Sequence, residues 1–210
     1  MSQQQITAVV FDLGGVLLDW DPRHLYRRLF ADPGEMEDFL ACICTPDWHR
    51  AHDLGEDVNQ SCLRLARRHP RHRDMIMAWV DPGDEMAAGQ IDEAVGVLAE
   101  LKARGVRCLV LSNMEPATFT ARLDRFRFMN WFDGYVISGL EGVAKPDPRI
   151  FQLLLRRHGL EPAATVFIDD SVVNTEAARG QGMAAVRYTP GELRCQLRAV
   201  GLTALSPALP

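Results

Sequence analysis

Five short stretches of nearly continuous apolar residues have the pattern of strands that are buried on both faces of a parallel sheet. They are Ile6–Phe11, Arg107–Ser112, Gly134–Ser138, Thr165–Asp169 and Ala184–Arg187. The segments between the later strands are typical of helices: Asp92–Arg104, Pro116–Phe126, Pro148–His158 and Val172–Arg179. Pro116 and Pro148 suit the first turn of a helix, while Gly105, Gly159 and Gly180 suit helix ends. This alternation predicts an α/β fold with a doubly wound parallel sheet.

The segment from about residue 19 to 89 has a different pattern. It contains no convincing strand, and its apolar residues recur at helical spacing, as in Leu25, Leu29 and Phe30. We read it as a small helical domain inserted between the first and second strands. The predicted division is therefore a core over residues 1–17 and 89–210 and a helical cap over residues 18–88.

Composition and charge narrow the class of protein. The chain has 210 residues, of which 47% are hydrophobic and 24% charged, as in an ordinary globular protein. Its formal net charge of −5 argues against a nucleic-acid partner. No apolar run is long enough to predict a membrane span. Five cysteines with no paired CxxC spacing favour a reduced, cytoplasmic protein, and both a monomer and a homodimer fit.

Polar residues follow the predicted strands, where open α/β sheets bind ligands. They are Asp12 with Gly14 and Gly15, Ser112 with Asn113, Lys145, and Asp169 with Asp170 and Asn174. Three crowded carboxylates would repel one another unless a cation lay among them, and hard oxygen ligands favour Mg²⁺, which often binds a substrate phosphate as well. A carboxylate beside Mg²⁺ can act as a nucleophile, while a hydroxyl and an ammonium group can hold phosphoryl oxygens.

These four motifs, in this order, resemble those of the haloacid dehalogenase superfamily, whose members are mostly phosphatases. The resemblance implies a Rossmann-like core, a helical cap after the first strand, and Mg²⁺-dependent hydrolysis of a small phosphate ester, such as a sugar phosphate, through an aspartyl-phosphate. It assigns the nucleophile to Asp12, phosphate or substrate binding to Ser112, Asn113 and Lys145, and metal binding to Asp12, Gly14, Asp169 and Asp170. Asp170 is the favoured direct ligand of the two neighbouring acids, and Asn174 supports the site.

Gly14 departs from the phosphatase pattern, which has a second aspartate at this position as general acid and base. Phe11–Asp21 nevertheless resembles a branch related to an α-glucose-1-phosphate phosphatase that tolerates glycine here. Asp19, Asp21 and His24 are candidates for a substitute acid. Two alternatives remain open: a 2-haloacid dehalogenase in which Asp12 attacks carbon, and a non-catalytic binding or regulatory protein.

Aromatic residues and histidines of the predicted cap have simpler interpretations. Trp20, Trp48 and Trp79 are expected to pack the small helical domain rather than to line a substrate site. His49 and His52 have a metal-like spacing but no further ligand motif, so we expect them on a surface helix.

Overall fold

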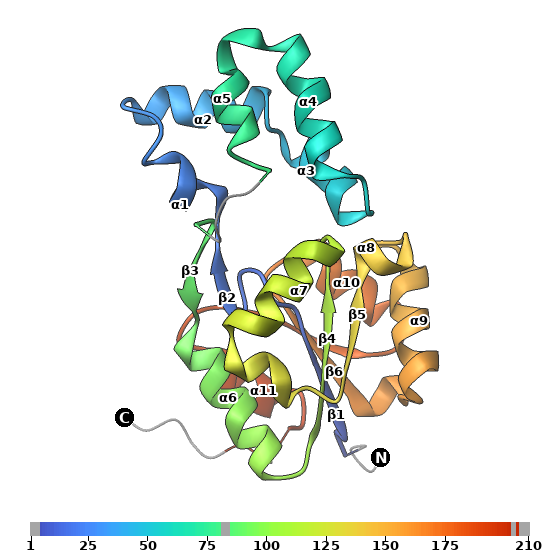
Figure 1. Ribbon diagram of the computed structural model, residues 1–210. Helices are drawn as coiled ribbons and strands as arrows, with labels where there is room; N and C mark the ends of the chain where they lie inside the picture. Colours follow the sequence, from blue (N-terminus) through green and yellow to red (C-terminus); the bar gives the residue numbers. More distant parts are fainter. Residues whose placement is uncertain (1–4, 81–84, 203–204, 206–210) are drawn as a thin grey trace.

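A five-stranded parallel sheet forms the centre of the protein, as the sequence predicts (Figure 1). The computed structural model describes residues 5–80, 85–202 and 205. Its strands lie in the order β5-β4-β1-β6-β7. Their bounds are β1 Ala8–Phe11, β4 Arg107–Ser112, β5 Gly134–Ile137, β6 Thr165–Asp169 and β7 Ala184–Arg187. Every residue of β1 is buried, because this central strand pairs with β4 on one side and β6 on the other.

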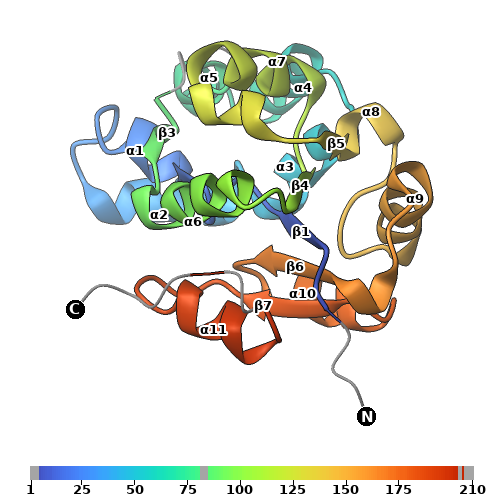
Figure 2. The same cartoon turned by 90° about the horizontal axis from the view of Figure 1, so that it is seen from below.

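Helices cover both faces of the sheet, which makes the core a three-layer α/β structure. Val9 and Phe11 of β1 face a cluster that includes side chains of α6 and α11, whereas Ala8 and Val10 face side chains of α9 and α10. Figure 2 shows α6 and α11 on one side of the sheet and α9 on the other. The helices of this part are α6 Asp92–Ala103, α7 Pro116–Arg125, α8 Ser138–Glu141, α9 Pro148–His158, α10 Val172–Arg179 and α11 Leu193–Ala199, with 3₁₀ turns η2 Arg127–Trp131 and η3 Pro162–Ala164.

A second group of helices lies between β1 and the rest of the core in the sequence. It comprises α1 Pro22–Tyr26, α2 Pro33–Cys42, α3 Pro46–Asp53, α4 Val58–Arg68, the 3₁₀ turn η1 Pro70–His72 and α5 Arg73–Met77. These helices share their own apolar cluster, in which Tyr26, Phe39 and Ile76 are fully or almost fully buried. Figure 1 shows them together at one end of the sheet. We call α1–α5 the insert.

A two-stranded antiparallel ribbon joins the insert to the core, and the sequence did not predict it. It pairs β2, Leu18–Trp20, with β3, Ala87–Gln90, and has an irregular register at Asp19 and Trp20. The expectation that residues 19–89 contain no strand is therefore wrong. The two strands are very short, β3 is poor in β-branched residues, and their pairing joins segments far apart in the chain, so no local pattern marks them.

Within the described residues, no helix combines the length and the apolar character that crossing a membrane requires.

Candidate active site

Four polar side chains meet at the carboxyl edge of the sheet, on the side that faces the insert. Asp12 directly follows β1, Ser112 ends β4 and Asp169 ends β6. Lys145 lies in the loop between α8 and α9, beyond β5. Parallel strands with crossover helices bring these positions to one edge. The structure thus places together the residues that the strand-end motifs singled out.

The four side chains form one buried hydrogen-bonded cluster. Lys145 Nζ lies 2.9 Å from Asp12 Oδ1 and donates to Asp169 Oδ2 at 2.7 Å. Ser112 Oγ donates to Asp12 Oδ1 at 2.8 Å, and the backbone N–H of Leu13 donates to the same oxygen at 2.7 Å. The Lys145 side chain is only 1% exposed. A buried ammonium held between two carboxylates is fixed in position by these contacts.

The cluster has more negative than positive charge. Asp170 joins Asp12 and Asp169, and one ligand oxygen from each of the three lies within 4.8 Å of the others. Burial raises the pKa of Asp12 to about 7, with Lys145 opposing and Asp169 adding to the rise. Burial and the Asp169 charge likewise raise the pKa of Asp170. Burial works to lower the pKa of Lys145, but Asp12 and Asp169 together hold it above its usual value. Three carboxylates and one ammonium leave a surplus that a divalent cation would neutralise.

The donor set of this cluster fits a hard divalent cation such as Mg²⁺. All three groups offer carboxylate oxygens, and no histidine or cysteine of the described residues belongs to the cluster. Asp169 already accepts hydrogen bonds from Lys145 Nζ, from the Ser171 N–H and from Asn174 Nδ2. Asp170 has no such set of donors and is exposed, which makes it the more available ligand.

Gly15 gives Asp170 its room. The φ angle of Gly15 is +72°, in the left-handed region, and a Cβ on Gly15 would lie 2.5 Å from Asp170 Oδ2. Gly14, by contrast, has ordinary space, since its nearest neighbour would be Trp20 Cβ at 3.8 Å. Glycine is thus required at position 15 by both backbone and space, whereas a side chain would fit at position 14.

Asn113 and Asn174 hold the cluster from outside. Asn113 Oδ1 accepts from the Lys145 N–H at 2.8 Å, and its Nδ2 donates to the Lys145 carbonyl at 3.0 Å. Asn174 Nδ2 donates to both oxygens of Asp169, at 3.0 and 3.1 Å. The first amide fixes the backbone that carries the lysine, and the second orients a carboxylate.

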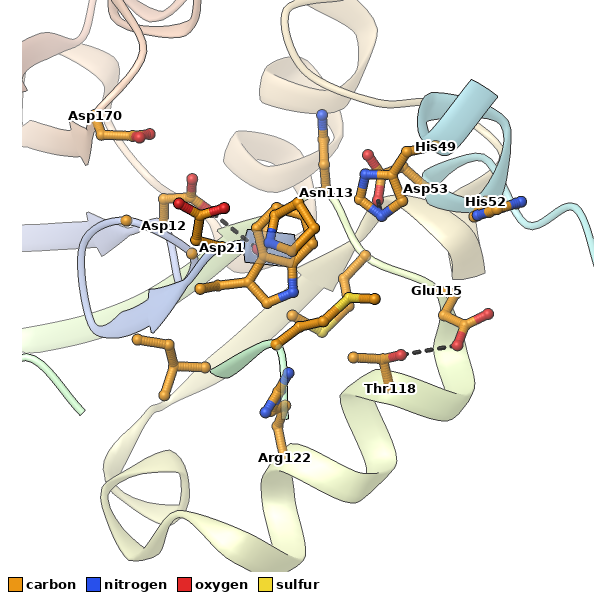
Figure 3. Close-up of a pocket in the computed structure, with 18 of the residues that line it drawn as sticks. Asp12, Asp21, His49, His52, Asp53, Asn113, Glu115, Thr118, Arg122 and Asp170 are labelled. Atoms are coloured by element: carbon orange, nitrogen blue, oxygen red, sulfur yellow. Dashed lines mark hydrogen bonds and ion pairs between the residues drawn. The ribbon is translucent and has the colours of Figure 1, made fainter. Parts of the chain in front are cut away.

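A cavity of about 460 Å³ opens above this cluster, between the core and the insert (Figure 3). Asp12, Ser112, Asn113, Lys145, Asp170 and Asn174 line its core side. Trp20 and Trp79 line it from the insert and its ribbon, with His49, His52 and Asp53 of α3. The core helix α7 and its N-terminus contribute Glu115, Thr118 and Arg122.

Comparison with known proteins identifies the family. The sequence profile of haloacid dehalogenase-like hydrolases matches residues 6–182. The chain belongs to this family. It is 27% identical over 194 residues to the sesquiterpene phosphatase astK of Aspergillus oryzae, covering 90% of this chain and 92% of that one. It is 28% identical over 192 residues to the fructose-1-phosphate phosphatase YqaB of Escherichia coli, covering 87% of this chain and 96% of that one.

A solved structure of a haloacid dehalogenase family enzyme, BT-2542 of Bacteroides thetaiotaomicron, shares the fold. Its TM-score is 0.70 at 20% sequence identity, with 90% of this chain and 96% of the other covered. The protein is therefore a haloacid dehalogenase-like hydrolase with a Rossmann-like core, and its relatives include phosphatases.

The three candidates for a substitute acid have different surroundings in this hydrolase. Asp21 lines the cavity. Asp19 and His24 are not among the residues that line it, and they contact each other, with 3.0 Å between Asp19 Oδ1 and His24 Nε2. Strand alternation explains this, because Leu18 and Trp20 of β2 face the cavity and Asp19 lies on the opposite face.

The expectation of a surface helix for His49 and His52 is wrong. His52 is 2% exposed and packs edge-on against Trp48, with 4.4 Å between the ring centroids. Its two ring nitrogens have no hydrogen-bond partner among the described residues. His49 stacks on Trp20 with 5.2 Å between ring centroids. Burial lowers the pKa of each imidazole to about 4, so both rings are neutral near pH 7.

Sequence reasoning missed α3 as a wall of the cavity, although a signal was present. Trp48 and His52 are four residues apart, as are His49 and Asp53, so both pairs lie along the same side of a helix. That spacing indicates an aromatic face that packs inward. The tryptophans were expected only to pack the insert. Trp79 does so, contacting Tyr26 and Trp48, and it also lines the cavity with Trp20.

Proposed function

We propose that this hydrolase is a Mg²⁺-dependent phosphomonoesterase that acts through an aspartyl-phosphate. The observation that carries the proposal is the buried cluster of Asp12, Ser112, Lys145 and Asp169, with Asp170 adjacent and a surplus of negative charge. The phosphatase names of two relatives that match nearly their whole length support the same reaction class. A dehalogenase, which displaces halide from carbon, has no need of an acidic pair that gathers a cation.

In this proposal the Asp12 carboxylate attacks phosphorus, the bond from phosphorus to the leaving oxygen breaks, and water then hydrolyses the aspartyl-phosphate. The Ser112 hydroxyl and the Lys145 ammonium, which now contact Asp12, would hold phosphoryl oxygens. Asn113 keeps Lys145 in place through two backbone hydrogen bonds.

The metal site of this proposal consists of the Asp12 and Asp170 carboxylates and the Gly14 carbonyl, with Asp169 beside them. Asn174 orients Asp169 through two hydrogen bonds. When bound, Mg²⁺ would offset the negative charge on the phosphoryl group. The chain's own part is to hold these oxygens close together against their mutual repulsion.

A small metabolite such as a sugar phosphate is the substrate class we propose. The cavity of about 460 Å³ is within the size range of small-molecule sites. The names of the relatives point to a sugar phosphate in one case and a sesquiterpene in the other. We further propose that residues 18–88 act as the cap of a core formed by 1–17 and 89–210, although residues 1–4, 81–84, 203–204 and 206–210 lie outside the described part of the chain.

A parallel assay tests this function. One arm follows phosphate release from p-nitrophenyl phosphate and a panel of sugar phosphates, with Mg²⁺ and with chelator; the other follows halide release from 2-chloropropionate. We expect phosphate release that chelator abolishes and that Asp12→Asn removes. Halide release that survives chelator would establish the dehalogenase instead, and metal binding without turnover would establish a non-catalytic protein.

A further inference from the structure

The proposed reaction needs a proton for the leaving group, and Gly14 cannot supply one. An alkoxide leaves slowly unless it is protonated as the bond to phosphorus breaks. Among the described residues, five carboxyl groups line the cavity: Asp12, Asp21, Asp53, Glu115 and Asp170. Asp12 and Asp170 belong to the charged cluster at the sheet edge. That leaves Asp21, Asp53 and Glu115 as donors among the described residues.

Asp21 and Glu115 already have structural hydrogen bonds. Asp21 caps α1, where its Oδ1 accepts from the backbone N–H of Arg23 at 2.8 Å and from the Arg23 guanidinium at 3.3 Å. Glu115 Oε1 accepts from the Thr118 hydroxyl at 2.8 Å at the start of α7. The carboxylate of Asp21 thus caps its helix, and that of Glu115 accepts from a hydroxyl, so both already act as acceptors.

Asp53 differs from both. Among the described residues, the nearest charged partner of its carboxyl group is His49, whose Nε2 lies 4.0 Å from Asp53 Oδ1, beyond hydrogen-bond distance. Its side chain is 15% exposed. Figure 3 shows it reaching the cavity from α3, on the opposite side from Asp170. It is a nearly buried acid that lines the cavity.

The core fixes the position of Asp53. The Ser138 hydroxyl of α8 donates a hydrogen bond to the Asp53 carbonyl and accepts one from the backbone N–H of Met114 at 3.0 Å. Two residues further on, a Cβ at Gly55 would lie 3.0 Å from the Gly139 carbonyl oxygen, so the backbones of insert and core nearly touch here. Asp53 thus lies where α3 meets the core rather than on the free part of the insert.

Its surroundings keep this acid protonated at unusually high pH. The other charged and titratable groups on its own helix are Asp47, His49, Arg50 and His52. Those on the elements around it are Lys145, Glu115 and Glu141. Burial raises the pKa of Asp53 to about 6, the charges of Lys145 and Arg50 oppose the rise, and Glu115 adds to it. His49 is neutral near pH 7, and Glu141 of α8 is paired with Arg157. A carboxyl with such a pKa can donate a proton near neutrality.

We propose that Asp53 is the general acid of this enzyme, supplied by the insert in place of the missing carboxyl at position 14. Its proton passes to the leaving oxygen as the phosphorus–oxygen bond breaks and the alcohol departs. The resulting carboxylate takes a proton from the water that attacks the aspartyl-phosphate, which restores the acid. This inference rests on the proposed phosphatase function.

Two substrates of similar shape separate proton donation from binding. p-Nitrophenyl phosphate releases a phenolate that needs no proton near neutral pH, whereas benzyl phosphate releases an alkoxide that does. For Asp53→Asn we expect kcat/KM for benzyl phosphate to fall by roughly 10²–10⁴-fold, while kcat/KM for p-nitrophenyl phosphate changes by less than about threefold. Because kcat/KM covers steps only through transfer to Asp12, the later role of Asp53 does not affect the comparison.

The pH profile adds a second readout. In the wild type, kcat/KM for benzyl phosphate should decline as pH rises above about 6, because the protonated acid is lost. Neither p-nitrophenyl phosphate nor Asp53→Asn should show this decline. Asp47→Asn is the matched control, since Asp47 is an exposed acid on the same helix and is not among the residues that line the cavity.

Gly14→Asp tests the replacement directly, because the space at Gly14 accepts a side chain. Added to Asp53→Asn, it should restore benzyl phosphate turnover at least tenfold. The inference is overturned if Asp53→Asn loses activity equally on both substrates or loses none on benzyl phosphate. It is also overturned if Asp21→Asn shows the selective loss instead. A Gly14→Asp protein that still hydrolyses p-nitrophenyl phosphate but gives no rescue would overturn it as well. A wild type that cleaves p-nitrophenyl phosphate alone also overturns it. A wild type without Mg²⁺-dependent activity on either ester refutes the proposed function itself.

Discussion

At Gly15 a single missing side chain determines where a carboxylate of the cluster can lie. A methyl group there would meet Asp170 Oδ2 at 2.5 Å, and the backbone has a φ of +72°. We expect Gly15→Ala to displace Asp170 and to raise the Mg²⁺ concentration for half-maximal activity at least about tenfold. A Mg²⁺ titration of phosphatase activity measures this. Gly96→Ala is the control, because its position in α6 is open and should leave the titration unchanged.

Asp12, the proposed nucleophile, lowers the stability of the folded protein when no metal is bound. Its pKa of about 7 in the folded protein exceeds the ordinary value of 3.8, so the folded state binds the extra proton between these pH values. Its contribution to stability therefore falls as pH rises through this window and is fully unfavourable above pH 7. In chelator at pH 8, we expect Asp12→Asn to raise the free energy of unfolding by about 1–3 kcal/mol, as measured by urea titration.

Asp12→Asn should also lower phosphatase activity by a factor on the order of 10³ or more, because it removes the group that attacks phosphorus. Mg²⁺ should stabilise the wild type and reduce the difference between the two proteins. A variant that is no more stable than the wild type in chelator at pH 8 would contradict this account of the charge surplus.

Helix α3 brings two neutral histidines to the cavity. Their low pKa values make the stability of the protein depend on pH in the acidic range. The pKa of His52 is about 4 in the folded protein and 6.5 when exposed, so the unfolded chain takes up the proton first as pH falls. Stability is thus complete above pH 6.5 and decreases from there toward pH 4. We expect His52→Gln to lessen the loss between pH 6.5 and 4.5 by about 1–2 kcal/mol, measured by urea unfolding at both pH values. His69, which is half-buried and lies outside the cavity, offers the matched His→Gln control.

In the whole molecule, Ser138 is one of the contacts between the insert and the core. The fully buried Ser138 contacts both the Asp53 carbonyl of α3 and the Met114 N–H that precedes α7. We expect Ser138→Ala to cost about 1–3 kcal/mol of stability, since it leaves buried polar groups unpaired. Because it also frees Asp53, we expect a larger fall in kcat/KM for benzyl phosphate than for p-nitrophenyl phosphate. Equal effects on the two esters would show that Ser138 has a structural role only.

Local signals were sufficient for much of the core. The predicted bounds of β4, β6, β7, α9 and α10 agree with the structure, because continuous apolar runs mark the strands and a proline or glycine marks several helix ends. The first strand starts at Ala8 rather than Ile6, which lies within the usual uncertainty of strand ends. The β2–β3 ribbon escaped prediction since its stability comes from pairing across the whole insert.

The order of residues along the chain was enough to predict the α/β fold and the meeting of Asp12, Ser112, Lys145 and Asp169. Residues that follow parallel strands must gather at one edge, so position along the chain is enough to place them. Only the tertiary structure decided what faces this cluster across the cavity. Which side of α3 turns inward, and hence whether His52 and Asp53 are buried, depends on packing between segments distant in sequence, and burial in turn sets the proton affinity of these groups.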